Sequence, residues 1–308
     1  MRRFVLFISV IISSVSSFAQ LVVTTGVMTP TQYVQNILVG GGVTVTNVTF
    51  SGQTNQIGEF NAVNTNPYLG LNSGIIMGSG DVTVAIGPNN SGSASLGGGN
   101  FGVGDPDLDV LMVNSTSNDA AILEFDFIPT GDTVKFKFVF GSEEYPEYVN
   151  SINDAFGFFL SGPGIAGPFT NNAINIALVP GTTTPVTINT VNSVSNPSYY
   201  VDNTVNTGAQ SVQYDGYTTV ITAIGVVQCG LVYHIKIAIA DASDTAWDSG
   251  VFLEAGSFSS NTVTLSSNID INGNDSILYE GCGTAFLDFV RSNSSDTATY
   301  NYTITGTA

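Results

Sequence analysis

Three aspartates at alternate positions, Asp105, Asp107 and Asp109, are the residues of this sequence whose spacing most directly suggests chemistry. In an extended chain their carboxylates share one face, roughly 7 Å from one to the next. Like charges at this spacing repel, and a divalent cation removes the repulsion while using the oxygens as ligands. The spacing predicts a cation site, with a solvated acidic strand edge as the alternative.

Two further acidic segments lie between runs of apolar residues, at 141–154 and 241–248. Calcium takes six to eight oxygen ligands and is often held by several loops at once, so we expect calcium as the cofactor. Neighbouring strand residues point to opposite faces, so Glu143 and Glu144 are not both expected to be ligands. The candidate ligands in these segments are Glu143, Glu144, Asp154, Asp241 and Asp248.

The composition excludes several classes of partner. The 308 residues include 24 Asp and Glu against 6 Lys and Arg, a formal net charge of −18. Such a chain repels phosphate backbones and anionic lipid, so no nucleic-acid partner is expected. One His and two Cys cannot form the usual zinc or iron–sulfur sites. Cys229 and Cys282 are able to pair in an oxidising compartment, and the sequence leaves this pairing open.

Two alternatives to a calcium-stabilised binding protein stay open. A glycoside hydrolase needs two carboxylates across a cleft, and Glu143, Glu144 and Asp241 are candidates. His234 alternates with apolar residues and is interpreted as a strand residue rather than a general base. A carbohydrate-binding module would stack sugars on loop tyrosines. Those tyrosines are Tyr145, Tyr148, Tyr199, Tyr200, Tyr214 and Tyr217.

The first nineteen residues have the pattern of a secretory signal peptide. Arg2 and Arg3 precede the apolar run 4–12, and small residues lead to a cleavage site after Ala19. The apolar run is too short to span a bilayer, and no later stretch reaches about 18 apolar residues. We therefore expect export to the cell surface or the medium and no transmembrane segment.

The rest of the sequence predicts an all-β fold. A short helix is expected after Thr29, with Pro30 in its first turn and glycines ending it. Beyond it, runs rich in Val, Ile, Thr and Phe alternate with Gly, Pro, Asn and Asp clusters. Residues 134–140 alternate apolar and polar side chains, as a half-buried strand does. A two-sheet β-sandwich or jelly-roll-like domain over 20–259 is the natural solution, with a second β module starting at 262.

Long motifs in a specific order resemble the choice-of-anchor L domain of exported bacterial surface proteins. They include the runs 123–129 (LEFDFIP), 139–148 (VFGSEEYPEY), 153–159 (NDAFGFF) and 214–218 (YDGYT), and they end with 248–258 (DSGVFLEAGSF). The resemblance implies a surface-attached or released multidomain protein, often sorted by the type IX secretion route and plausibly adhesive. It implies no catalytic activity and no agreed ligand, so the partner is expected to be a surface glycan or protein receptor.

The tail 262–308 is similar to the opening strands of a Calx-beta module, an Ig-like sandwich. Residues 276–283 (SILYEGCG) and 289–291 (FVR) carry this weaker resemblance. In such modules the acid of the first strand ligates calcium, and the matching residue is Glu280. The expected organisation is a signal peptide (1–19), the choice-of-anchor L-like domain (20–259) and a truncated Calx-beta-like module (262–308).

Overall fold

The computed structural model describes residues 21–63, 69–96, 101–112, 115–205, 212–260, 263–270 and 284–291. The expected signal peptide, Glu280 and Cys282 lie outside the described residues. In the range expected to form a second module, the structure describes strands β15 (Val263–Asp270) and β16 (Thr284–Arg291), which pair with each other in antiparallel fashion.

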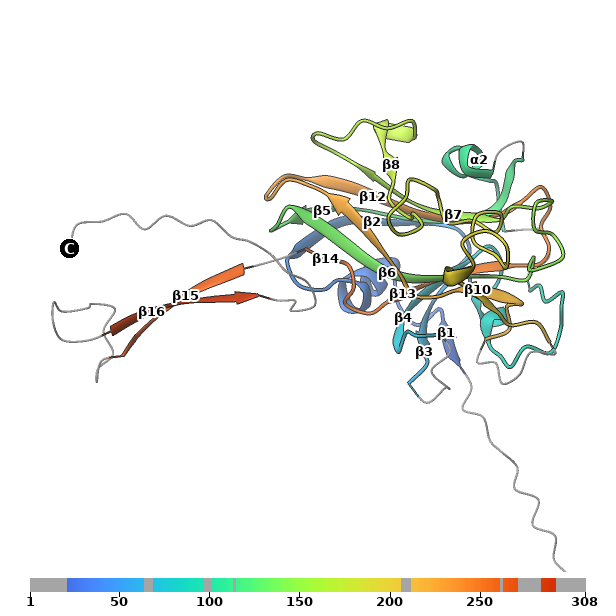
Figure 1. The fold of residues 1–308 in the computed structure, drawn as a ribbon, viewed down its shortest axis with the longest axis horizontal. Helices are drawn as coiled ribbons and strands as arrows, with labels where there is room; N and C mark the ends of the chain where they lie inside the picture. Colours follow the sequence, from blue (N-terminus) through green and yellow to red (C-terminus); the bar gives the residue numbers. More distant parts are fainter. Residues whose placement is uncertain are drawn as a thin grey trace, which may run out of the picture.

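Two antiparallel sheets form the main domain and lie as two layers (Figure 1), so the predicted all-β sandwich is confirmed. In the first sheet the strand order is β1-β3-β4-β13-β6-β10-β9, and β11 and β14 also pair with β6. Its strands are β1 (Val22–Thr25), β3 (Ile57–Asn61), β4 (Ser73–Gly78), β6 (Thr133–Ser142), β9 (Tyr200–Asp202), β10 (Gly216–Thr218), β11 (Ile221–Val226), β13 (Ser249–Glu254) and β14 (Ser259–Ser260).

The second sheet has the order β2-β5-β12-β7-β8. Its strands are β2 (Val43–Ser51), β5 (Ser117–Pro129), β7 (Ala155–Ser161), β8 (Ile174–Asn175) and β12 (Tyr233–Ala242). The central strand β12 is buried on both faces: Ile235 and Ile237 belong to the main core, whereas Ala238 packs in a smaller cluster under helix α2 (Pro106–Met112). This helix therefore covers the outer face of the second sheet.

Phenylalanines from both sheets fill the space between the layers. The alternation in β6 is confirmed, because Phe136, Phe138 and Phe140 are fully buried. Phe138 packs against Phe156 of β7 with 5.0 Å between ring centroids. Phe258 stacks on Phe136 at 4.3 Å, so the segment after β13 closes the core.

The predicted N-terminal helix is confirmed and short. The Thr29 side chain accepts a hydrogen bond from the Gln32 amide, and the Gln32 side chain accepts one from the Thr29 amide, which together form a capping box. The helix consists of α1 (Pro30–Gln32) and a π-helical turn η1 (Tyr33–Leu38). Short 3₁₀ turns elsewhere are η2 (Val82–Ala85), η3 (Thr170–Asn172) and η4 (Pro197–Tyr199).

Candidate functional site

The segment of Asp105, Asp107 and Asp109 is helical, so the extended geometry expected for it is wrong. Asp105 Oδ1 accepts hydrogen bonds from the amides of Asp107 (3.0 Å) and Leu108 (3.2 Å), which makes Asp105 the N-cap of α2. Pro106 then occupies the first helical position, where its missing N–H costs nothing. The three carboxylates therefore do not form one row.

Each of these aspartates has a hydrogen-bond partner in the described structure, and Asp105 and Asp107 share theirs. The Lys236 ammonium lies 2.9 Å from both oxygens of Asp105 and also donates to Asp107 Oδ2. Asp109 Oδ1 accepts from the amide and the hydroxyl of Ser117, both at 2.6 Å. A lysine from β12 thus supplies the positive charge that the sequence alone assigned to a metal ion.

The other predicted acids come together at one end of the sandwich. Antiparallel pairing brings the end of β6 and the start of β13 side by side, with Ser142 opposite Ser249. It likewise places the end of β12 beside the start of β7, with Ala240 opposite Ala155. Six buried carboxylic acids lie at or next to these strand ends, and we call them the acidic end: Glu143, Glu144, Asp154, Asp215, Asp241 and Asp248.

Asp154 and Asp241 connect the two sheets at this end. Asp154 Oδ1 accepts from the Ala242 amide and Oδ2 from the Ser249 hydroxyl, both at 2.8 Å, so it joins the second sheet to β13 of the first. The Asp241 side chain is close enough to Asp154 for the two carboxyl groups to affect each other's pKa. Burial raises the pKa of Asp154 to about 7, and burial together with the charge of Asp154 raises that of Asp241 well above its ordinary value.

Glu143 and Glu144 are both buried, but each has different neighbours. Glu143 Oε2 accepts from the Ala94 amide at 3.1 Å. Burial, reinforced by Asp215 and Asp248, raises the pKa of Glu143 to about 8. Burial next to Asp154 raises the pKa of Glu144 to about 9. Ionisation of either carboxyl group in this buried position therefore has a large electrostatic cost.

Among the residues that the structure describes, three buried carboxylate oxygens of the acidic end have no hydrogen-bond partner: Glu143 Oε1, Glu144 Oε2 and Asp241 Oδ1. None of the ion pairs of the described residues neutralises the acidic end. These pairs join Lys137 to Glu254, His234 to Glu124 and Asp126, and Lys236 to Asp105 and Asp107. As placed, no three or more His, Cys, Asp or Glu side chains in the described ranges are arranged to hold a metal ion.

Sequence reasoning missed Asp215 as a member of this group. Asp215 precedes β10 directly, its pKa is raised by burial to about 6, and its Oδ1 accepts from Asn89 Nδ2 at 2.6 Å. Asp248 stands in the same position before β13, with Ser95 Oγ donating to its Oδ1 and the Leu96 amide to its Oδ2. Asp215, Asp248 and Asp154 each lie immediately before a strand. This position is the sequence signal that could have identified Asp215.

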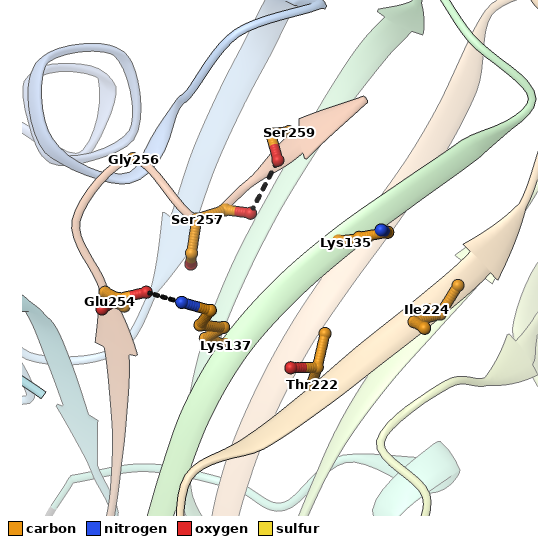
Figure 2. A pocket seen from close by; sticks show the side chains of 8 residues that line it. All are labelled: Lys135, Lys137, Thr222, Ile224, Glu254, Gly256, Ser257 and Ser259. Atoms are coloured by element: carbon orange, nitrogen blue, oxygen red, sulfur yellow. Dashed lines mark hydrogen bonds and ion pairs between the residues drawn. The ribbon is translucent and has the colours of Figure 1, made fainter. Parts of the chain in front are cut away.

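A groove of about 320 Å³ lies on the first sheet (Figure 2). Its residues on β6 and β14 are at the opposite end of β6 from Ser142, and so away from the acidic end. Lys137 Nζ points toward Glu254 Oε2 across it, at 3.0 Å. Glu254 is the single carboxylate among the lining residues, so this groove does not present the carboxylate pair that glycoside hydrolysis needs. The lining residues are Lys135, Lys137, Thr222, Ile224, Glu254, Gly256, Ser257 and Ser259.

The tyrosines considered for sugar stacking are mostly packed inside the protein. Tyr145, Tyr214 and Tyr217 are at most 2% exposed and cannot meet a sugar ring. Tyr145 donates to the Val191 carbonyl at 2.6 Å, and the Tyr148 ring packs edge-on against Trp247. His234 is a strand residue, as expected, with Nδ1 2.8 Å from Asp126 Oδ1 and Nε2 3.2 Å from Glu124 Oε1.

Comparison with known proteins adds a family to this geometry. No curated protein and no solved structure matches the chain. Within the described ranges, none of the helices has the length and apolar character needed to cross a membrane. The model of the choice-of-anchor L domain matches residues 22–259, which covers both sheets and the whole acidic end. The chain therefore belongs to the choice-of-anchor L family, a family of exported bacterial surface proteins and not of enzymes.

Proposed function

We propose that this chain is a non-enzymatic, adhesion-type protein of the bacterial cell surface whose acidic end binds calcium. Residues 1–19 direct export, and the sandwich presents loops to a surface glycan or protein receptor. The observation that carries this proposal is the acidic end itself, where three buried carboxylate oxygens have no partner. Calcium prefers such oxygens and tolerates irregular geometry, so it suits this site better than a smaller cation does.

Glu144, Asp154 and Asp241 are the ligands we propose first. Asp154 and Asp241 affect each other's pKa, and among the neighbouring charges that of Asp154 has the largest effect on Glu144. Because three such side chains are not yet arranged around one point, calcium binding would draw the loop after β6 toward the loop between β12 and β13. Backbone carbonyls and the exposed Asp244 in the second loop are available to complete the coordination.

The role of calcium in this proposal is structural. Without the ion, the buried carboxylates either repel one another or take up protons; with it, their charge is neutralised and the loops keep one geometry. Asp105, Asp107 and Asp109 are not needed for this site, because Lys236 and Ser117 already satisfy them. The proposed Calx-beta-like module would add a separate calcium ligand, Glu280.

The test is a thermal melt of the full chain in chelator and across a calcium titration, with Glu144→Gln and Asp241→Asn as site variants. The matched control is Glu254→Gln, since Glu254 lies on the first sheet away from the acidic end. We expect a saturable rise in melting temperature for the wild type and the control, and a much smaller one for the site variants. Equal responses in all four proteins, or none, would refute the site.

Adhesion is tested separately, by binding of the chain to glycan arrays and to host-cell or bacterial surfaces with and without calcium. Binding that needs calcium and is lost in Glu144→Gln supports the proposed function. A hydrolase would behave differently: Glu143→Gln or Glu144→Gln would abolish an activity on a glycan substrate while leaving the protein's melting temperature intact.

A further inference from the structure

Lys236, Asp105 and Asp107 form a buried triad between helix α2 and the outer face of the second sheet. The side chains are 10%, 7% and 5% exposed, respectively. Lys236 Nζ also lies 4.9 Å from the centroid of the Phe159 ring, so one side of the ammonium is apolar. The proposed function does not use this triad.

An ion pair of this kind carries a large desolvation cost, which excellent geometry only partly repays. Two carboxylates share one ammonium, so the site keeps an excess negative charge in a dry environment. An amine and a carboxylic acid react with each other in their neutral forms, so amide formation here needs a group that moves a proton from the ammonium to the carboxylate. The triad therefore places a nucleophile, an electrophile and a proton carrier in contact.

We propose that Lys236 and Asp105 condense to an intramolecular amide, an isopeptide cross-link between β12 and the start of α2, with Asp107 as the proton carrier. Asp105 is the electrophile because its Oδ1 already accepts two backbone amides, from Asp107 and Leu108. The same pair stabilises the negative charge that develops on this oxygen when the carbonyl carbon is attacked.

The two aspartates have different roles in this proposal because their hydrogen bonds differ. Asp107 Oδ1 is fixed by the amide (2.8 Å) and the hydroxyl (2.9 Å) of Thr170, which aims Oδ2 at Lys236. Burial by itself raises the pKa of Asp107, but the hydrogen bonds from Lys236 and Thr170 outweigh this and hold the pKa below its ordinary value. Asp107 thus starts ionised, ready to accept a proton.

The steps balance without any added reagent. Asp107 takes one proton from the Lys236 ammonium and passes it to Asp105 Oδ2, which leaves a neutral amine and a neutral carboxyl group. The amine nitrogen attacks Cγ of Asp105, a C–N bond forms, and the carbonyl electron pair moves to Oδ1. Asp107 then carries a second proton from the nitrogen to Oδ2, the C–O bond breaks, and water leaves. An ammonium and a carboxylate become an amide and one water, and Asp107 ends ionised, as it began.

The surroundings favour this reaction over the same reaction in water. Groups held in contact react with effective concentrations of about 10⁵–10⁸ M, which offsets the unfavourable equilibrium of amide formation in solution. A cavity of about 40 Å³, lined by Asp107, Glu124, Phe159, His234 and Lys236 among others, adjoins the triad and has room for the released water. The bond would connect residues 131 positions apart, which suits a surface domain exposed to pulling forces.

The first test is the intact mass of the purified, denatured full chain, expressed with its initiating Met to keep the N-terminus defined. We expect a mass lower than the sequence mass by one water. Trypsin is then expected to cleave after Lys137 but not after Lys236, because an acylated lysine is not a substrate. Lys137 is the matched control, since it forms an exposed ion pair with Glu254 at 3.0 Å. A full sequence mass with cleavage after both lysines would overturn the proposal.

Three variants test the roles. Lys236→Arg keeps the charge but removes the nucleophile, and should show the full sequence mass. Asp107→Asn removes the proton carrier and should also stay unlinked. Asp105→Asn keeps an electrophilic carbonyl, so it should still form the amide, with loss of ammonia in place of water. Cross-linking in Lys236→Arg would contradict the assignment, as would a linked Asp107→Asn together with an unlinked Asp105→Asn. The mass of the wild-type protein decides the proposal even where a variant fails to fold.

Discussion

The acidic end makes the stability of the calcium-free protein depend strongly on pH. Glu143 and Glu144 have an ordinary pKa of 4.5, which burial raises in the folded protein to about 8 and about 9. Because the folded pKa lies above the unfolded one, the folded state binds more protons between these values. The stabilising contribution is complete below pH 4.5 and is lost as the pH rises toward 8 and 9.

The magnitude follows from proton counting. A group that is protonated when folded and ionised when unfolded changes the free energy of unfolding by ~1.4 kcal/mol per pH unit. Glu143 and Glu144 alone give a loss of about 5 kcal/mol over the two units from pH 5 to 7. The raised pKa values of Asp154, Asp215, Asp241 and Asp248 add to this loss. Typical domains have a total stability of about 5–15 kcal/mol, so the effect is a large part of the whole. Glu124 and Asp126, whose pKa values are lowered, titrate below this window. His234, whose pKa is raised by the hydrogen bond to Glu124, also contributes stability that is lost as the pH rises.

The assay is urea unfolding in chelator at pH 5, 6 and 7, followed by tryptophan fluorescence and circular dichroism. Glu144→Gln should be more stable than the wild type at pH 7 and should lose about 2.5 kcal/mol of the change in stability between pH 5 and 7, because an amide of the same shape cannot ionise. Saturating calcium should flatten the wild-type profile. A stability that is the same at pH 5 and 7 in chelator would refute the reasoning, since it would mean that these carboxylates find charge compensation within the fold.

Three other changes follow from packing and surface contacts. Phe258→Ala removes a ring that contacts Phe125, Phe127 and Phe136, and should lower the free energy of unfolding by about 3–5 kcal/mol in urea titrations. Thr29→Ala removes the N-cap and should lower it by about 1 kcal/mol by the same measurement. Lys137→Ala breaks an ion pair whose lysine is 52% exposed, and should change it by less than about 1 kcal/mol, an effect that disappears in high salt.

Local patterns in the sequence predicted the elements that local forces determine. The alternation in 134–140 gave β6, and Thr29 with Pro30 gave the first helix. Asp105 followed by Pro106 is an equally good helix start, with Leu108, Leu111 and Met112 on the buried side, but the regular spacing of the acids favoured an extended interpretation. At 187–190 the chain turns, because the Thr190 hydroxyl oxygen accepts a hydrogen bond from the Thr187 amide.

The candidate site was predictable only in part, because it depends on which strand ends meet. The sequence predicted that the acids of 105–109, 143–154 and 241–248 act together. Antiparallel pairing of β6 with β13 and of β12 with β7 brings only the last two segments together. Asp215 joins them through β10, a strand of three residues with little sequence signal. Lys236, the ion-pair partner of Asp105, lies 131 residues further along the chain in β12. No local pattern in the sequence indicates that these two residues are in contact.

The two acidic regions of the domain show one constraint met in two ways. A chain with 24 acids and 6 basic residues cannot give each buried carboxylate a cation of its own. Beneath α2 the fold uses Lys236, and the contact is close enough that the two charges can be removed together as an amide. At the acidic end, none of the ion pairs of the described residues includes the three oxygens that lack a hydrogen-bond partner. Their negative charge must therefore be neutralised by protons or by an external cation. Under this proposal, the stability of the protein depends on calcium and pH through the acidic end and not through the Lys236 triad. A chelator should therefore change the melting temperature without changing the intact mass.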